Sequence, residues 1–155
     1  EQLSELGKML QALVTQEEAY QRLMQLPGLG VITATLLGSE LGNGSAFRNG
    51  RAFAAYLGLT PRQHSSGGKN VLLGISKHGN RYLRTLLVHG ARTTLRSILF
   101  GRSPFGGGPI EAWATELLNR RGKNKTVVAL AGKLARMAWA ILAKGVSFQK
   151  AACAA

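Results

Sequence analysis

The sequence predicts a mainly α-helical domain that contains a helix-hairpin-helix, an N-terminal coiled-coil-like helix and at most a short β-hairpin. Residues 1–25 and 80–100 repeat apolar side chains at helical spacing, and residues 125–144 form an alanine-rich apolar segment. We divide the chain into a helical arm or coiled-coil connector (1–25), a main domain (26–146) and a tail (147–155) that we expect to be loosely ordered.

The arm carries its apolar side chains on alternating three- and four-residue steps. They are Leu3, Leu6, Leu10, Leu13, Tyr20 and Met24, with Glu17 interrupting the series. This pattern favours two interpretations equally. The helix either forms the seam of a coiled coil with a partner, or folds as an amphipathic helix onto its own domain.

Residues 23–37, LMQLPGLGVITATLL, have the pattern of a helix-hairpin-helix. Gly28 and Gly30 allow a tight turn and leave backbone N–H groups at the start of the second helix. Such a site binds a phosphate oxygen without recognising base sequence. A plain turn between two helices is the alternative interpretation.

Two adjacent serines, Ser65 and Ser66, follow in a glycine-rich stretch after Pro61, which ends the preceding helix. The glycines after them have no Cβ, so a large group such as a nucleotide can approach closely. We expect residues 70–74 to form a short extended piece. Cations surround the serines in sequence: Arg62, Lys69, Lys77, Arg81 and Arg84. The pattern suggests a hydroxyl presented to a phosphate, although an ordinary flexible loop has the same composition.

Residues 80–100 form the most regular helical pattern. At 100° per residue, Arg81, Arg84, Arg92 and Arg96 fall within an arc of roughly 120°, opposite an apolar face. Arginines gathered on one stripe repel one another in solvent, but they can bind phosphates in a forked geometry. Lys133 and Arg136 lie near one face of the last helix. The alternative interpretation of the arginine stripe in residues 80–100 is an ordinary solvated surface.

Charge and composition narrow the function further. The net charge is +13, and residues 61–136 hold fourteen of the twenty basic side chains with two glutamates. This asymmetry favours a polyanionic partner, and nucleic acid is a stronger candidate than a membrane.

The chain has no aspartate, so it cannot build a two-metal nuclease centre alone, and we expect no metal site. One cysteine excludes a disulfide framework. With no signal-peptide pattern or long apolar run, we expect a soluble cytoplasmic protein.

Four ordered motifs carry a family resemblance: LPGLGVITA, FRNGRAFAAYLGLTPRQHSSGGK, LLGISKHGNRYLRTLLVHGAR and RRGKNKTVVALAGKLARMAWAIL. Together they resemble the C-terminal transposase domain of the DEDD-type insertion-sequence recombinases, family one-ten and its eleven-eleven subgroup, related to the pilin-gene invertase. The resemblance implies a RuvC-like nuclease domain that binds Mg²⁺ and lies outside this chain. It also implies dimers or tetramers, and a structured RNA that guides the choice of DNA.

The resemblance further implies a catalytic serine. The family's Ser-Gly pair matches Ser66-Gly67, so Ser66 is the expected nucleophile and Ser65 the reserve. It would hold a DNA strand as a phosphoserine. Lys69, Lys77, Arg81 and Arg84 are the candidates for stabilising charge on phosphorus. The general base and Mg²⁺ would come from the RuvC-like domain, so we expect the isolated chain to bind DNA without cutting it.

Two other interpretations remain open. The chain could be a helix-hairpin-helix module that binds DNA without chemistry, its serines contacting phosphate. It could instead be an RNA-binding protein that recognises shape through a basic face.

Overall fold

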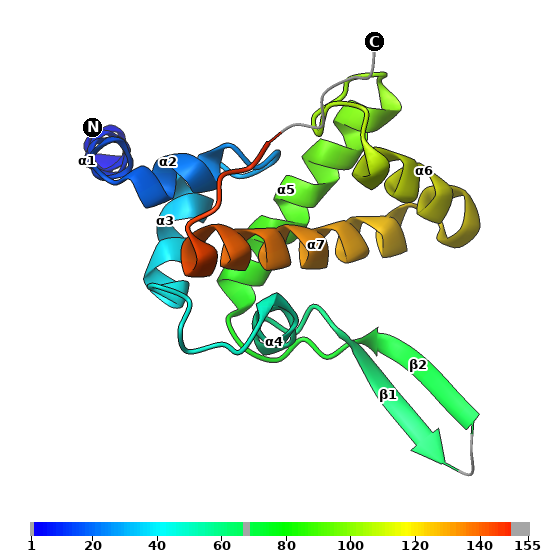
Figure 1. Cartoon of the computed structure of the whole chain (residues 1–155). Coiled ribbons are helices and arrows are strands. Elements are labelled where there is room, and N and C mark those ends of the chain that lie inside the picture. Colours follow the sequence, from blue (N-terminus) through cyan, green and yellow to red (C-terminus); the bar gives the residue numbers. More distant parts are fainter. Residues whose placement is uncertain (1, 67–68, 150–155) are drawn as a thin grey trace.

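A computed structural model describes residues 2–66 and 69–149 of the 155-residue chain. Within these ranges the chain is mainly helical, as predicted, with one two-stranded antiparallel sheet (Figure 1). The elements in chain order are α1 (Gln2–Gln16), α2 (Glu18–Met24), α3 (Val31–Leu41), α4 (Gly50–Tyr56), β1 (Pro61–Ser66), β2 (Lys69–Ile75), α5 (Arg81–Leu99), α6 (Pro109–Arg121) and α7 (Lys123–Lys144).

Helix α7 is the centre of the fold. It contacts α2, α3, α4, α5 and α6, which lie around it (Figure 1). Its buried positions alternate leucines such as Leu130 and Leu134 with small residues such as Ala131, Ala135 and Ala138, so neighbouring helices approach closely. By length and mean hydropathy (1.5) α7 could cross a membrane, but its many contacts are those of a core helix.

Helix α5 supplies the second half of the core. Leu83, Leu87, Ala91 and Leu95 repeat every four residues on one face and are all buried. Asn80 caps the start of the helix: its side-chain Oδ1 accepts a hydrogen bond from the backbone N–H of Leu83 at 3.0 Å. The helical period predicted for residues 80–100 is therefore confirmed.

The N-terminal arm divides at Glu17, whose backbone is extended. Helix α1 buries Val14, whereas Leu3, Leu6, Met9 and Leu13 are exposed. Helix α2 belongs to the core, because Leu23 is fully buried and the helix contacts α3 and α7. The two halves of the predicted arm thus have different environments.

A β-hairpin projects from the helical body beside α4 (Figure 1). Ser65 pairs with Asn70 and Ser66 with Lys69, and the register shifts between Pro61 and Gln63. The extended piece predicted at residues 70–74 is confirmed as part of β2. The serines, expected on a loop, instead occupy the last paired positions of β1. Strand β1 has no apolar alternation of its own and is defined by its pairing with β2.

The turn between α2 and α3 packs directly against α5. Gly28 has a φ of +84°, and a Cβ added there would collide with the carbonyl oxygen of Gly90. The two backbones therefore meet where a side chain cannot fit.

We expect Gly28→Ala to lower the free energy of unfolding by about 2–4 kcal/mol, because it adds left-handed backbone strain to overpacking against α5. Gly30→Ala is the matched control, since Gly30 has a negative φ and open space around its Cβ position. It should cost less than about 1 kcal/mol. Urea unfolding followed by far-UV circular dichroism measures both values, and equal losses would contradict this account.

Candidate nucleic-acid interface

The serine pair lies at the far end of the hairpin. The register places Lys69 directly opposite Ser66, so this cation and the serine share the end of the sheet. Gly67 of the predicted Ser-Gly pair lies outside the described residues. From Pro61 to Ser66 the strand spans about 17 Å, at roughly 3.3 Å per residue. We call the place where segments 56–60 and 76–80 meet the root of the hairpin. Cations before Pro61 or after Ile75 therefore lie near this root rather than beside the serines.

Three of the cations predicted to surround the serines lie at this root or just after it: Lys77, Arg81 and Arg84. Lys77 is exposed and adopts a left-handed backbone with a φ of 60°, which is unusual for a residue with a Cβ. Its N–H donates to the carbonyl oxygen of Gly58 at 3.1 Å. Arg81 begins α5 and is exposed. Arg62 is exposed on β1, one residue from the root.

Arg84 has a structural task that the sequence did not reveal. Its Nη1 donates hydrogen bonds to the carbonyl oxygens of Leu57 at 3.0 Å and His78 at 2.8 Å. These carbonyls lie on the two chain segments that enter and leave the hairpin. Arg84 therefore joins these segments, and it is less available to a ligand than Arg81.

The outer face of α5 carries an exposed row of cations. Arg81, Arg92 and Arg96 lie opposite the buried leucines, as the helical period predicted. Two exposed aromatic residues flank the row: Tyr82 at 59% and Phe100 at 69% exposed. The Arg96 guanidinium lies 5.4 Å from the centre of the Phe100 ring. Exposed rings beside cations are typical of surfaces that bind single-stranded nucleic acid. Neither ring was among the nucleic-acid contacts predicted from the sequence.

A second basic surface lies where α4 meets α7. A hollow of about 330 Å³ is lined by Asn49, Gly50, Arg51, Arg136, Trp139 and Ala140. Arg51 and Arg136 come from different helices and are both exposed. The Trp139 indole N–H donates to the carbonyl oxygen of Gly44 at 3.1 Å, which fixes the ring at the edge of the hollow. Two guanidinium groups beside an indole suit a phosphate and the base or sugar attached to it. Arg51 was not among the predicted site residues.

Lys133 lies on α7, three residues before Arg136, and packs against α6. Its ammonium lies 4.5 Å from the centre of the Trp113 ring. Partial burial, and secondly the nearby charge of Arg136, lower the pKa of Lys133. The neighbouring Gly132 faces Leu59, two residues before β1. Helix α7 thus packs against the chain segment that leads into the hairpin.

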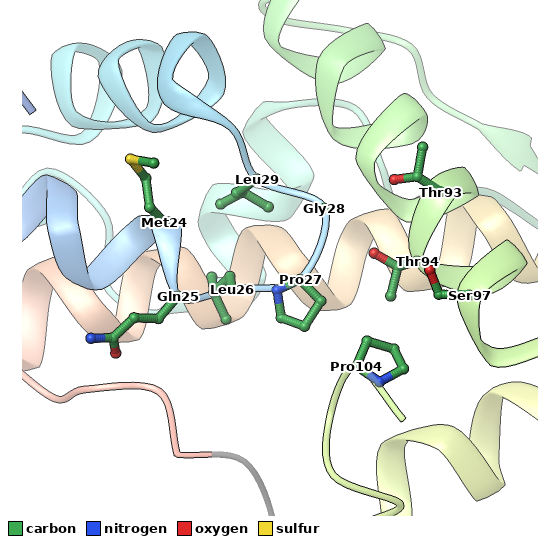
Figure 2. Close-up of a pocket in the computed structure, with 10 residues that line it drawn as sticks. All are labelled: Met24, Gln25, Leu26, Pro27, Gly28, Leu29, Thr93, Thr94, Ser97 and Pro104. Atoms are coloured by element: carbon green, nitrogen blue, oxygen red, sulfur yellow. The ribbon is translucent and has the colours of Figure 1, made fainter. Parts of the chain in front are cut away.

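The turn that carries Gly28 and Gly30 borders another hollow, of about 350 Å³ (Figure 2). Its lining combines residues 24–29 with Thr93, Thr94, Ser97 and Pro104, and includes no charged side chain. The hydroxyls of Thr93 and Thr94 each donate to the Gly90 carbonyl oxygen at 2.8 Å. Any attraction for phosphate here depends on backbone N–H groups and neutral side chains such as Gln25 and Ser97, so this hollow is a weaker anion site than the α4–α7 hollow.

Across residues 2–66 and 69–149, no group of three or more His, Cys, Asp or Glu residues could hold a metal ion. Glu40 on α3 accepts hydrogen bonds from Tyr56 and Asn80, at the two ends of the hairpin root.

Known proteins resemble this chain over most of its length. The transposase for insertion sequence element IS1328 of Yersinia enterocolitica is 41% identical over 97% of this chain and 43% of its own length. The transposase for insertion sequence element IS1111A of Coxiella burnetii is 42% identical over 90% of this chain and 37% of its own length. The pilin gene-inverting protein of Moraxella bovis is 29% identical over 83% of this chain and 38% of its own length.

The chain therefore spans about two-fifths of the length of these relatives. The family model described as Transposase IS116/IS110/IS902 family matches residues 20–99, from α2 to the end of α5. This segment includes the hairpin and its root. The chain belongs to the IS116/IS110/IS902 family of transposases.

Proposed function

We propose that this chain is the DNA-binding, serine-bearing part of a transposase that cuts and rejoins DNA. The observation that carries the proposal is the position of Ser65 and Ser66 at the end of a projecting hairpin, on a strongly basic body, within a transposase family. A hairpin that extends from the body can reach a duplex held against the body.

The proposed reaction is nucleophilic substitution at phosphorus. The Ser66 hydroxyl oxygen attacks a DNA phosphodiester, its proton passes to a general base, and the deoxyribose oxygen leaves with a proton. One strand is then held as a phosphoserine. The hydroxyl of another strand attacks this phosphorus and displaces the serine oxygen, so DNA is rejoined and the number of phosphoester bonds is unchanged. Lys69, which pairs with Ser66 in the sheet, is the proposed cation that stabilises charge on phosphorus.

The base and Mg²⁺ are proposed to belong to a RuvC-like domain outside this chain. The described residues do not offer a ligand set for the metal, so no step of the reaction is assigned to it here. A dimeric or tetrameric assembly would bring such domains and the serine hairpins of different copies to one DNA. The exposed Leu3, Leu6 and Leu13 of α1 support assembly through a coiled coil. A guide RNA is the second proposed nucleic-acid partner.

Three basic surfaces are proposed to hold nucleic acid: the hairpin, the outer face of α5 and the α4–α7 hollow. They include the predicted contacts Arg62, Lys69, Lys77, Arg81, Arg92, Arg96, Lys133 and Arg136, with Arg51 added. Such contacts exchange condensed counterions for protein cations, so binding weakens steeply with salt.

One observation favours the non-catalytic alternative, a module that only binds DNA or RNA. Lys77, Arg81 and Arg84 lie at the hairpin root and not beside the serines. If the serines merely contact phosphate, these distant cations need no further explanation.

In the full-length protein, we expect Ser66→Ala to abolish strand exchange and the covalent protein–DNA adduct, because no oxygen remains to attack phosphorus. DNA affinity should change less than about twofold, since one neutral contact is lost. Ser65→Ala is the matched control and should retain exchange. Adducts that survive denaturation and protease digestion provide the measurement. Exchange by Ser66→Ala protein would favour the binding module, unless Ser65→Ala abolishes exchange, which would make Ser65 the nucleophile.

For this chain alone, we expect duplex DNA binding without cutting. Replacing both Arg51 and Arg136 with Gln should reduce the salt slope of log K by about 1 per arginine that contacts a phosphate. Lys8→Gln on α1 is the control and should leave the slope unchanged. Fluorescence anisotropy across a salt series measures the slopes. An unchanged slope in the double variant would show that the α4–α7 hollow does not contact DNA. Mg²⁺-dependent nicking by this chain alone would contradict the proposal that cutting needs the RuvC-like domain.

A further inference from the structure

Two chain segments meet at the root of the hairpin. The outgoing segment, 56–60, follows α4, and the incoming segment, 76–80, precedes α5. They are joined by backbone hydrogen bonds from Ser76 N–H to the Thr60 oxygen at 2.9 Å and from Lys77 N–H to the Gly58 oxygen at 3.1 Å. These bonds hold the segments to each other, but they do not fix the hairpin to the helical body.

Arg84 of α5 connects both segments to the helical body, and Glu40 on α3 makes a second such connection. Its Oε1 accepts a hydrogen bond from the Tyr56 hydroxyl at 2.5 Å, and its Oε2 accepts one from Asn80 Nδ2 at 3.1 Å. Tyr56 is the last residue of α4, and Asn80 caps α5 through its Oδ1. One carboxylate thus binds both ends of the hairpin insertion to a third helix.

The surrounding contacts leave little slack at this place. A Cβ added to Gly79, whose φ is +74°, would collide with the carbonyl oxygen of Tyr56. Arg84 bonds to Leu57 and His78 from the α5 side. The bond to Glu40, and secondly the charge of Glu40, raise the pKa of Tyr56, so its hydroxyl stays a donor.

We propose that Glu40 is a positioning residue for the serine hairpin: by holding Tyr56 and Asn80 to α3 it sets the direction in which β1 and β2 leave the body. The proposal rests on the proposed function of the serines. A rotation of about 10° at the root moves the end of a 17 Å strand by about 3 Å. Nucleophilic attack tolerates far less, since misplacement by about 1 Å can cost a hundredfold in rate.

The exposure of the network separates positioning from folding. Tyr56 is 44% exposed, so water replaces part of what is lost when the bond is removed. Removal of the carboxylate should therefore change the hairpin direction while the helical core remains folded. Glu116, an exposed glutamate on α6, is the matched control for loss of one negative charge.

The first experiment measures the hairpin direction in this chain. Nitroxide labels are attached at Leu73→Cys on β2 and Ala112→Cys on α6, in a Cys153→Ser background. Pulsed electron paramagnetic resonance then gives the distribution of distances between the two labels. We expect Glu40→Ala to broaden the distribution about twofold or shift its maximum, Tyr56→Phe to have a smaller effect, and Glu116→Ala to have none. Unchanged circular dichroism confirms folding. An unaltered distribution in Glu40→Ala would overturn the proposal.

The second experiment measures strand exchange by the full-length protein. We expect Glu40→Ala to reduce the rate constant at saturating DNA about tenfold or more with DNA affinity unchanged, and Glu40→Gln, which keeps one acceptor oxygen, to restore part of it. A displaced hairpin with normal exchange would overturn the positioning role. If Ser66→Ala and Ser65→Ala proteins both still exchange strands, the proposed function fails, whereas the distance measurement still decides whether Glu40 orients the hairpin.

Discussion

The close packing of α4 on α7 is the constraint on which the rest of the molecule depends. A Cβ added to Gly50, the first residue of α4, would lie 3.0 Å from the Cα of Arg136 on α7. The side chain of Asn49 caps α4 at the same place, accepting a bond from the Ala52 N–H at 2.9 Å. Because α4 is only seven residues long, its fixed start also fixes its end, where the chain turns into the hairpin. The end of α4, from which the chain enters the hairpin, and the α4–α7 hollow therefore depend on the same packing.

The charge distribution follows from the same architecture. Burial of a cation is costly unless it is paired, and the chain has few acidic side chains with which to pair. Most cations whose burial is described are therefore exposed, several of them on α5 and α7, while leucine and alanine fill the space between the helices. Arg84 is the instructive exception, because backbone carbonyl oxygens satisfy its guanidinium where no carboxylate is present.

Much of the fold could be predicted, because helices leave a strong period in the sequence. The apolar repeat of α5, the alanine-rich α7 and the extended residues of β2 were all identified from pattern alone. The site was harder. Lys77 and Arg81 are close to the serines in sequence, but the hairpin separates them along its length, whereas Lys69 pairs with Ser66. Hydrogen bonds between Glu40 and residues sixteen and forty positions away leave no local signal, so neither they nor the structural task of Arg84 could be inferred. Whether Ser65, Ser66 and the predicted DNA contacts act as proposed stays a prediction.

The two tryptophans give the protein a built-in optical probe. Trp113 and Trp139 each have a lysine ammonium over the ring, Lys133 at 4.5 Å and Lys144 at 5.8 Å from the ring centre. Trp139 also borders the hollow that holds Arg51 and Arg136. A nucleobase that enters this hollow lies against the indole and quenches its emission, so occupancy of this one surface can be followed in real time without any attached dye.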